Sequence, residues 1–192
     1  MEKIILASNS PRRRELLAAA NIKFSVVVSE AEENFPSGMN FQDTAIFIAT
    51  NKAKIVKENY PDNLIIAADT IVVCDNKILG KPKDKNEAIE MLNFLSGKTH
   101  EVITGVCILK DSENISFAET TEVEFHNLSE EQIKFYVENY KPFDKAGGYA
   151  IQEWLGMIGI KNIHGDYYNV VGLPVNRVYR EILRILSTIQ LK

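Results

Sequence analysis

The chain has 192 residues, of which 45% are hydrophobic and 25% are charged, and its net charge is −4 at pH 7. This is the composition of an ordinary globular protein, and the negative net charge argues against a general nucleic-acid or membrane-surface binder. No apolar run approaches the length of a membrane span, and the first ten residues hold too short a run for a signal peptide, so we expect a cytoplasmic protein.

Short apolar runs alternate with helical patterns in the first part of the chain. Ser10 and Asn40 are residue types that cap helices, Pro11 suits a first helical position, and Asn21 is a plausible stop. The predicted elements are a strand in KIILAS, a helix from Pro11 to about Ala20, a strand from Phe24 to Ser29, a helix from Asn40 to about Asn59, and a strand in LIIAADTIVVC.

Capping signals also mark the helices of the second part. Asp84 with Glu87, and Ser129 with Gln132, resemble capping boxes. They predict a helix from Asp84 to near Gly97, strands in HEVITGVCIL and TTEVEFHNL, a helix from Ser129 to about Tyr140, an irregular segment DKAGGYAIQ, and an amphipathic helix after Pro174.

The predicted elements mix strands and helices without strict alternation. This order favours an α/β or α+β body around one mixed sheet flanked by helices. We expect one domain over residues 1–192, built as two lobes. Cys74 and Cys107 lie in apolar runs without metal-ligand spacing, so buried reduced thiols are predicted.

The stretch SNSPRRRELL places three arginines in the first turn of a helix. That end of a helix carries partial positive charge and free N–H groups, so it favours acidic groups. Two interpretations of Arg12, Arg13 and Arg14 are therefore open. Either their unfavourable interaction with the helix end is small and tolerated, or an anion binds at this place.

Two charged residues interrupt apolar patterns. Lys52 falls on the stripe predicted for its helix, four residues after Ile48 and three before Ile55, so it is either a lysine at a groove edge or a cation placed to meet an anion. Asp69 lies within the most apolar run of the chain, where a carboxylate must be paired, hydrogen-bonded or metal-bound.

Three loops hold further candidates, each of which has a simpler structural interpretation. The acidic loop with Glu32 and Glu33 could complete a cation site or be merely solvated. Lys81 follows a glycine in a rigid turn, and Gln152 ends a glycine-rich loop whose backbone could approach a ligand. Together, these cations, acids and a helix N-terminus predict a polyphosphate bound by basic groups and bridged to carboxylates by a divalent ion.

The ordered segments SNSPRR, ATNKA, AADTIV, GKP, LSGKTHEVITGV, DKAGGYAIQ and GDYYNVVGLP resemble the Maf family of nucleoside triphosphate pyrophosphatases. The resemblance covers nearly the whole chain. It implies an elongated two-lobed body with a central cleft, related to the inosine triphosphate pyrophosphatase architecture. It also implies hydrolysis of a nucleoside triphosphate to the monophosphate and pyrophosphate, aided by Mg²⁺ or Mn²⁺.

The family divides by base, and this chain resembles the branch that acts on dTTP and UTP through Arg12, Thr70 and Gln152. By the same resemblance Asp69 is the proton acceptor. We expect three other groups of site residues. Ser8, Ser10 and Arg13 bind phosphate, Lys52 and Lys81 flank the leaving pyrophosphate, and Glu33 binds the metal together with Asp69. The chain departs from the family pattern at Asn9, where glycine is frequent, and after Gln152, where glycine is expected first and Glu153–Trp154 stands instead.

Other functions remain open at this point. The substrate could be 7-methyl-GTP or ITP, or the chain could inhibit septum formation by binding a protein partner, with nucleotide only as a signal. The resemblance also suggests a homodimer. We expect a nucleoside triphosphate as the ligand, with no nucleic acid and no membrane among its partners.

Overall fold

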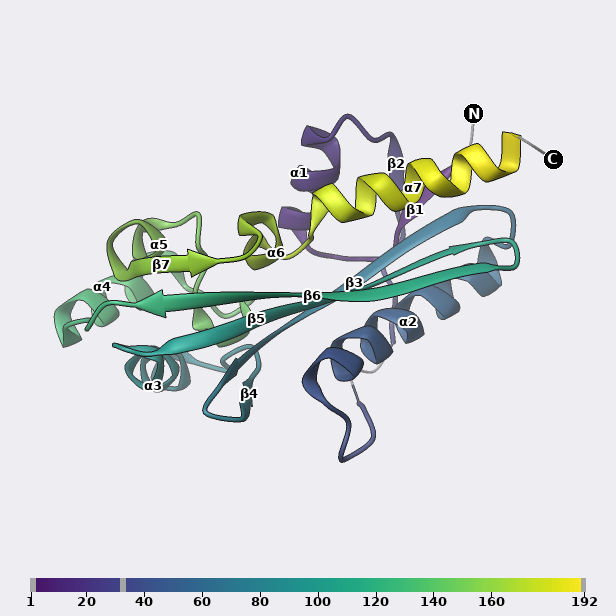
Figure 1. Ribbon diagram of the computed structural model, residues 1–192. Coiled ribbons are helices and arrows are strands. Elements are labelled where there is room, and N and C mark those ends of the chain that lie inside the picture. Colours follow the sequence, from purple (N-terminus) through teal and green to yellow (C-terminus); the bar gives the residue numbers. More distant parts are fainter. Residues whose placement is uncertain (1–2, 32–33, 191–192) are drawn as a thin grey trace. The chain divides into compact units, whose positions relative to one another are not determined.

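The computed structural model describes residues 3–31 and 34–190. Figure 1 shows a mixed sheet of long strands with helices packed on it. The elements are β1 (Ile4–Leu6), α1 (Pro11–Ala19), β2 (Phe24–Val26), α2 (Phe41–Asn59), β3 (Leu64–Cys74), β4 (Lys77–Leu79), α3 (Lys85–Leu95), β5 (Thr99–Lys110), β6 (Glu113–Phe125), α4 (Glu130–Tyr140), the 3-10 helix η1 (Ala146–Gly148), α5 (Trp154–Gly159), β7 (Ile160–His164), α6 (Tyr167–Val171) and α7 (Val175–Gln190).

The strand order is β2-β1-β3-β5-β6-β7, with β4 paired to β3. β1 runs parallel to β2 and β3, whereas β4 is antiparallel to β3 and β7 is antiparallel to β6. The predicted α/β class with a mixed sheet flanked by helices is therefore confirmed. No helix in the described part of the chain is both long and apolar enough to cross a lipid bilayer.

The chain divides into two compact units. Unit 1 comprises residues 1–69, 104–119 and 172–192, and unit 2 comprises residues 70–103 and 120–171. The boundary passes through the long strands β3, β5 and β6, so each of these strands contributes residues to both units. The cleft expected from the family resemblance stays a prediction.

Unit 1 buries both faces of its sheet, which explains the unbroken apolar start of β3. Successive side chains of a strand point to opposite faces. Leu64 and Ile66 pack with α7, whereas Ile65 and Ala67 pack with α2. Figure 1 shows these two helices on opposite faces of the strands.

The backbones of α2 and β5 lie unusually close together at Gly105. A Cβ atom built at Gly105 would come within 2.2 Å of the carbonyl carbon of Ala45, so no side chain fits there. This close packing fixes the position of α2 against the sheet of unit 1.

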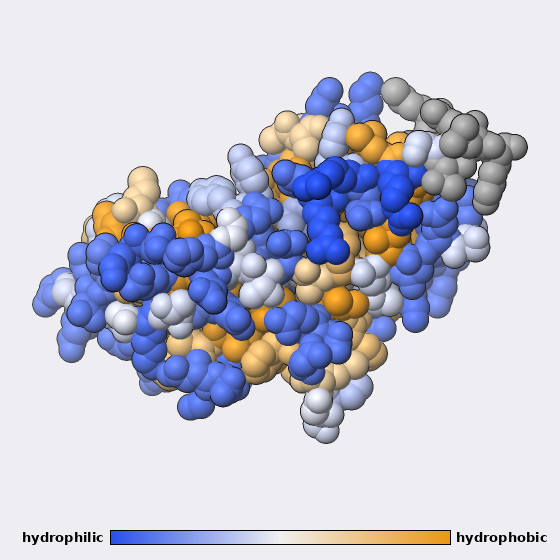
Figure 2. All heavy atoms as spheres, viewed as in Figure 1, coloured by the Kyte–Doolittle hydropathy of each residue, from blue (hydrophilic) through white to orange (hydrophobic). Residues whose placement is uncertain are grey.

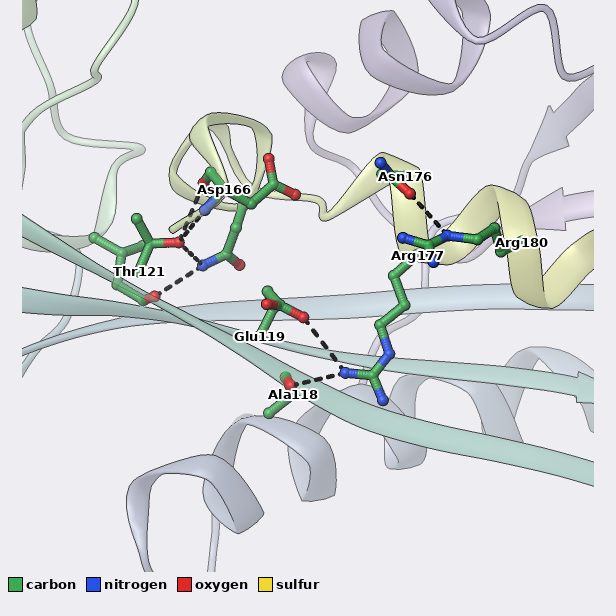
Figure 3. Close-up of polar contacts among 9 residues, drawn as sticks. Ala118, Glu119, Thr121, Asp166, Asn176, Arg177 and Arg180 are labelled. Carbon is green, nitrogen blue, oxygen red and sulfur yellow. Dashed lines mark hydrogen bonds and ion pairs between the residues drawn. The ribbon is translucent and has the colours of Figure 1, made fainter. Parts of the chain in front are cut away.

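Arginines make the outward side of α7 strongly polar. Deep-blue spheres lie over this helix in Figure 2, and Arg177, Arg180 and Arg184 are exposed on it. Arg177 Nη1 lies 3.4 Å from both the Ala118 carbonyl and Glu119 Oε2, and its guanidinium stacks on Phe117 with 4.0 Å to the ring centroid (Figure 3). These contacts fasten α7 to β6 and partly neutralise the basic surface.

Unit 2 has its own core between its part of the sheet and the helices α3 and α4. Leu92 and Leu95 from α3 pack with Ile133 and Tyr136 from α4 and with Phe125 from β6. The capping box at Ser129 is confirmed, because its side chain accepts from Gln132 N while Gln132 Oε1 accepts from Ser129 N.

A buried network in unit 2 connects β6 to the start of α6. Thr121 Oγ1 donates to the Asp166 carbonyl and accepts from Asp166 N, both at 3.1 Å. Asn169 Nδ2 donates to Thr121 Oγ1 at 2.9 Å and to the Val102 carbonyl at 3.0 Å (Figure 3). Within the segment GDYYN, Asp166 and Asn169 therefore have a structural role.

The predicted strand LIIAADTIVVC is confirmed, because β3 spans Leu64–Cys74 and includes Asp69 and Thr70. Other local predictions need correction. Glu87 accepts from Lys83 N at 2.7 Å, and not from the cap residue Asp84, so this helix start is not a reciprocal capping box. The strands β4 and β7 were not predicted, because each is short and lacks a clear alternating pattern.

Candidate functional site

Ser8 and Ser10 lie in the loop that joins β1 to the first turn of α1. Ser10 is the N-cap, and its hydroxyl accepts from Arg13 N at 3.4 Å. Ser10 N in turn donates to the Ser8 hydroxyl at 3.2 Å. Both hydroxyls are thereby held at the N-terminus of α1, where backbone N–H groups favour an anion.

The arginine side chains of α1 differ in what they contact. Arg13 is buried, with Nε donating to the Gly172 carbonyl at 2.8 Å and Nη1 donating to the Ser8 hydroxyl at 3.2 Å. Arg14 donates to the Asn9 carbonyl at 3.2 Å, and Arg12 is half-buried. Arg13 therefore fixes the Ser8 loop in addition to placing a positive charge beside it.

Lys52 and Asp69 form a largely buried ion pair. Lys52 Nζ donates to Asp69 Oδ1 at 2.6 Å, and the side chains are only 12% and 11% exposed. Lys52 points towards the protein body, as expected from its helix position. The predicted stripe was wrong at Ile55, which is 38% exposed, because the buried face of α2 runs through Ala49, Ala53 and Val56 instead.

Strand register brings the serine loop and Asp69 to the same end of unit 1. Leu6 of β1 pairs with Ile66 of the parallel strand β3, and Ala7 N donates to the Ile66 carbonyl at 2.8 Å. Ser8 follows directly, and Asp69 lies three residues beyond Ile66. Carboxyl ends of parallel strands are where ligands collect in open α/β sheets.

The expected metal ligands are only partly described. Glu33 lies outside the described residues, so its placement against Asp69 stays a prediction. Within residues 3–31 and 34–190 no three His, Cys, Asp or Glu side chains gather as a metal site. The Asp69 carboxylate is a described donor at this end of unit 1.

Three further candidates, Thr70, Lys81 and Gln152, belong to unit 2. Gly147, in the glycine-rich loop before Gln152, donates its N–H to the Gly80 carbonyl at 3.0 Å, next to Lys81. Its backbone is left-handed, with φ of 70°, and a Cβ there would lie 3.1 Å from Val72, two residues beyond Thr70 on the same face of β3. The segments that carry these candidates are therefore in contact.

Sequence reasoning missed a buried hydrogen bond that anchors the glycine-rich loop. His100 Nε2 lies 2.7 Å from the Tyr149 hydroxyl, and both side chains are buried. Burial lowers the pKa of His100 to about 4 and raises that of Tyr149. Among the described residues, His100 Nδ1 has no hydrogen-bond partner. A histidine in a mostly apolar strand, two residues before Val102, was the available signal.

The depressed pKa of His100 predicts a loss of stability in mild acid. The unfolded chain, with the ordinary value of 6.5, binds more protons than the folded chain between pH 6.5 and about 4. The free energy of unfolding should therefore fall as pH falls through this range, by about 3 kcal/mol from this group. Urea unfolding measured at several pH values between 4 and 6.5 checks this pH dependence. The His100→Gln variant should flatten the dependence, whereas the exposed-site variant His126→Gln should not; equal slopes in both variants would exclude this cause.

Comparisons with known proteins identify the family of this chain. The model of a family described as Maf-like protein matches residues 3–185. A dTTP/UTP pyrophosphatase of Phocaeicola vulgatus is 49% identical over 185 residues, which cover 95% of this chain and 96% of the relative. A dTTP/UTP pyrophosphatase of Bacillus cereus is 52% identical over 182 residues, which cover 95% of each.

One solved structure is similar in fold. A HAM1 protein from Coxiella burnetii aligns with 96% of this chain and 100% of its own, with a TM-score of 0.51 and 18% sequence identity. At that identity the likeness concerns the fold alone. On the family match and the close relatives, the chain belongs to the Maf family.

Proposed function

We propose that this protein hydrolyses dTTP and UTP to the nucleoside monophosphate and pyrophosphate. The observation that carries the proposal is the Lys52–Asp69 pair, buried at the same strand end of unit 1 as the Ser8–Arg13 cluster. Relatives that are about half identical over nearly the whole chain are named dTTP/UTP pyrophosphatases, which supports the choice of substrates.

The residues of the α1 start suit the binding of phosphate oxygens. The Ser8 and Ser10 hydroxyls accept hydrogen bonds from Ser10 N and Arg13 N, and each still has its own O–H to donate to a phosphate oxygen, while Arg12 and Arg13 supply positive charge. Because the Arg13 guanidinium already holds Ser8 and the Gly172 carbonyl, it stabilises the shape of the anion site before substrate arrives.

Lys52 suits a bridging role between the carboxylate and a phosphate. An ammonium group has three donors, and one of them goes to Asp69 Oδ1. We propose that the positive charge of the same group also neutralises the leaving pyrophosphate. We assign Lys81, which is exposed in unit 2, a similar charge-neutralising role.

Asp69 orients the attacking water and accepts its proton. Water attacks the α-phosphorus, the bond to the bridging oxygen breaks, and pyrophosphate leaves with its charge balanced by the basic groups. Phosphoryl transfer requires little covalent work from the protein, so positioning and charge stabilisation account for most of the rate. Asp69 is held by Lys52 in one orientation, as this role requires.

A divalent cation fits the donors present. Mg²⁺ commonly uses one or two protein carboxylates and takes its other ligands from substrate phosphates and water. Asp69 is such a carboxylate, with lone pairs beyond the one used by Lys52, and Glu33 is the second ligand that we propose. The cation would supply neutralisation of the triphosphate charge and a lower pKa of the bound water.

Base choice is assigned to Gln152 and Thr70. The exposed Gln152 amide can both donate to and accept from the edge of uracil or thymine. A site with such groups rejects bases that leave them unpaired. Pyrophosphate release from dTTP, UTP, CTP, GTP, ITP and 7-methyl-GTP, measured side by side with Mg²⁺ or Mn²⁺, tests this. We expect dTTP and UTP to be hydrolysed fastest, and a preference for any purine would overturn the assignment.

A further inference from the structure

Gln152 occupies a tight turn in unit 2. Glu153 N donates to the Ala150 carbonyl at 3.2 Å, so residues 150–153 form a β-turn with Gln152 at its third position. Ala150 and Ile151 are buried, whereas Gln152 is exposed. The turn therefore presents one polar side chain from an otherwise packed backbone.

One buried tyrosine hydroxyl joins the two ends of this turn. Tyr136 extends from α4 and is fully buried. Its hydroxyl donates to Glu153 Oε2 at 2.5 Å and accepts from Ala150 N at 3.1 Å. Ala150 and Glu153 are the first and last residues of the turn, so a single group fixes both.

Lys145 balances the charge of Glu153. Lys145 Nζ lies 3.3 Å from Glu153 Oε1 and 2.8 Å from Asp144 Oδ1, and its side chain is only 9% exposed. The two oxygens of Glu153 thus have different partners, one a hydroxyl and one an ammonium. A carboxylate bound on both oxygens has little freedom to rotate, which limits movement of the turn.

We propose that Tyr136, Glu153 and Lys145, here called the turn clamp, are positioning residues that determine base specificity through Gln152. The inference rests on the proposed function, because it needs Gln152 to read the base. Recognition of a base edge requires donors and acceptors held to about 0.5 Å. Loop segments are ordinarily more mobile than this, and the clamp removes that mobility at the turn itself.

The test compares UTP with CTP, whose bases differ in the donors and acceptors of one edge. We expect the ratio of kcat/KM for UTP to that for CTP to fall about tenfold in Tyr136→Phe. The ratio should also fall in Gln152→Ala. The double variant should discriminate no worse than Gln152→Ala alone, because the clamp acts only through that residue. Glu138→Gln, which alters an exposed α4 pair with Lys85, is the matched control and should keep the ratio.

Two further measurements keep the test decisive. Hydrogen exchange of the Ala150 amide should speed up at least tenfold in Tyr136→Phe, while β3 amides stay unchanged. If Tyr136→Phe fails to fold, Glu153→Ala removes the other end of the same contact and should give the same loss of discrimination.

The outcomes separate the two ideas. A wild-type chain that does not prefer UTP would contradict the proposed function. The inference alone would be overturned if the wild-type chain prefers UTP and a clamp variant keeps that preference. The same holds if the clamp variant lowers kcat/KM for UTP and for CTP by the same factor. The inference would also be overturned if the UTP-to-CTP ratio of kcat/KM in the double variant fell by the product of the factors measured for Tyr136→Phe and Gln152→Ala.

Discussion

The Asp69→Asn variant should lose about a hundred-fold to ten-thousand-fold in kcat with dTTP, the range typical for removal of a general base. The amide cannot accept the proton of the attacking water, and it no longer carries the charge that holds Lys52 at 2.6 Å. Because asparagine has nearly the same shape, the packing of β3 should change little. Steady-state hydrolysis of dTTP at saturating substrate measures the effect.

Asp75→Asn is the matched control. Asp75 follows the same strand and forms an ion pair with Lys98 at 2.8 Å, but both partners are substantially exposed. Exposed pairs contribute little to stability, so this variant should retain its activity and its unfolding midpoint. A kcat of Asp69→Asn within about threefold of the wild type would rule out both the proton-accepting and the water-orienting role.

Replacing Lys52 by methionine should damage both activity and stability. The change leaves the Asp69 carboxylate, only 11% exposed, without its ionic partner. Removing one member of a buried pair is more harmful than removing both, and allowing for the partial exposure we expect the free energy of unfolding to fall by about 2 kcal/mol. We expect kcat/KM for dTTP to fall about a hundred-fold, because the cation beside the leaving group is lost.

The exposed residue Lys54, on the same helix, supplies the control variant Lys54→Met, which should behave as wild type. The double variant Lys52→Met/Asp69→Asn gives a sharper check. It contains no unpaired buried charge, so it should be at least as stable as Lys52→Met alone. A double variant that loses the sum of the two single losses would show that the two side chains do not act as a pair.

Elements with strong local signals were predictable from sequence. The caps Ser10, Asn40, Asp84 and Ser129 each start a helix where expected, because their side chains bond to the first N–H groups of that helix. The apolar run of β3 was also clear, since both faces of its first part are covered by helices. Short strands such as β4 depend on a partner supplied by the rest of the fold, so their own residues carry little signal.

Candidate site residues stood out in the sequence where a charge broke an apolar pattern. Lys52 and Asp69 each stood out for this reason, and the structure joins them, although residue spacing alone could not indicate that each is the other's partner. Arg13 was predicted as a phosphate ligand, and its bonds to Ser8 and to the Gly172 carbonyl add a structural role that links segments 159 residues apart.

The turn clamp lay beyond sequence reasoning for a different reason. Tyr136 falls on the buried stripe of α4 with Ile133 and Val137, so it is indistinguishable from an ordinary core aromatic until its hydroxyl is seen to bind Ala150 and Glu153. Glu153 was a visible departure from the family pattern, and its contacts with Tyr136 and Lys145 are the basis of its proposed positioning role. The cytoplasmic location, the metal and the homodimer remain predictions.

Hydrolysis of dTTP in ¹⁸O-labelled water tests the central claim most directly, with the products separated and their masses measured. Attack of water on the α-phosphorus predicts one labelled oxygen in the thymidine monophosphate and none in the pyrophosphate. Label found in pyrophosphate, or products that are the diphosphate and orthophosphate, would contradict the proposed reaction.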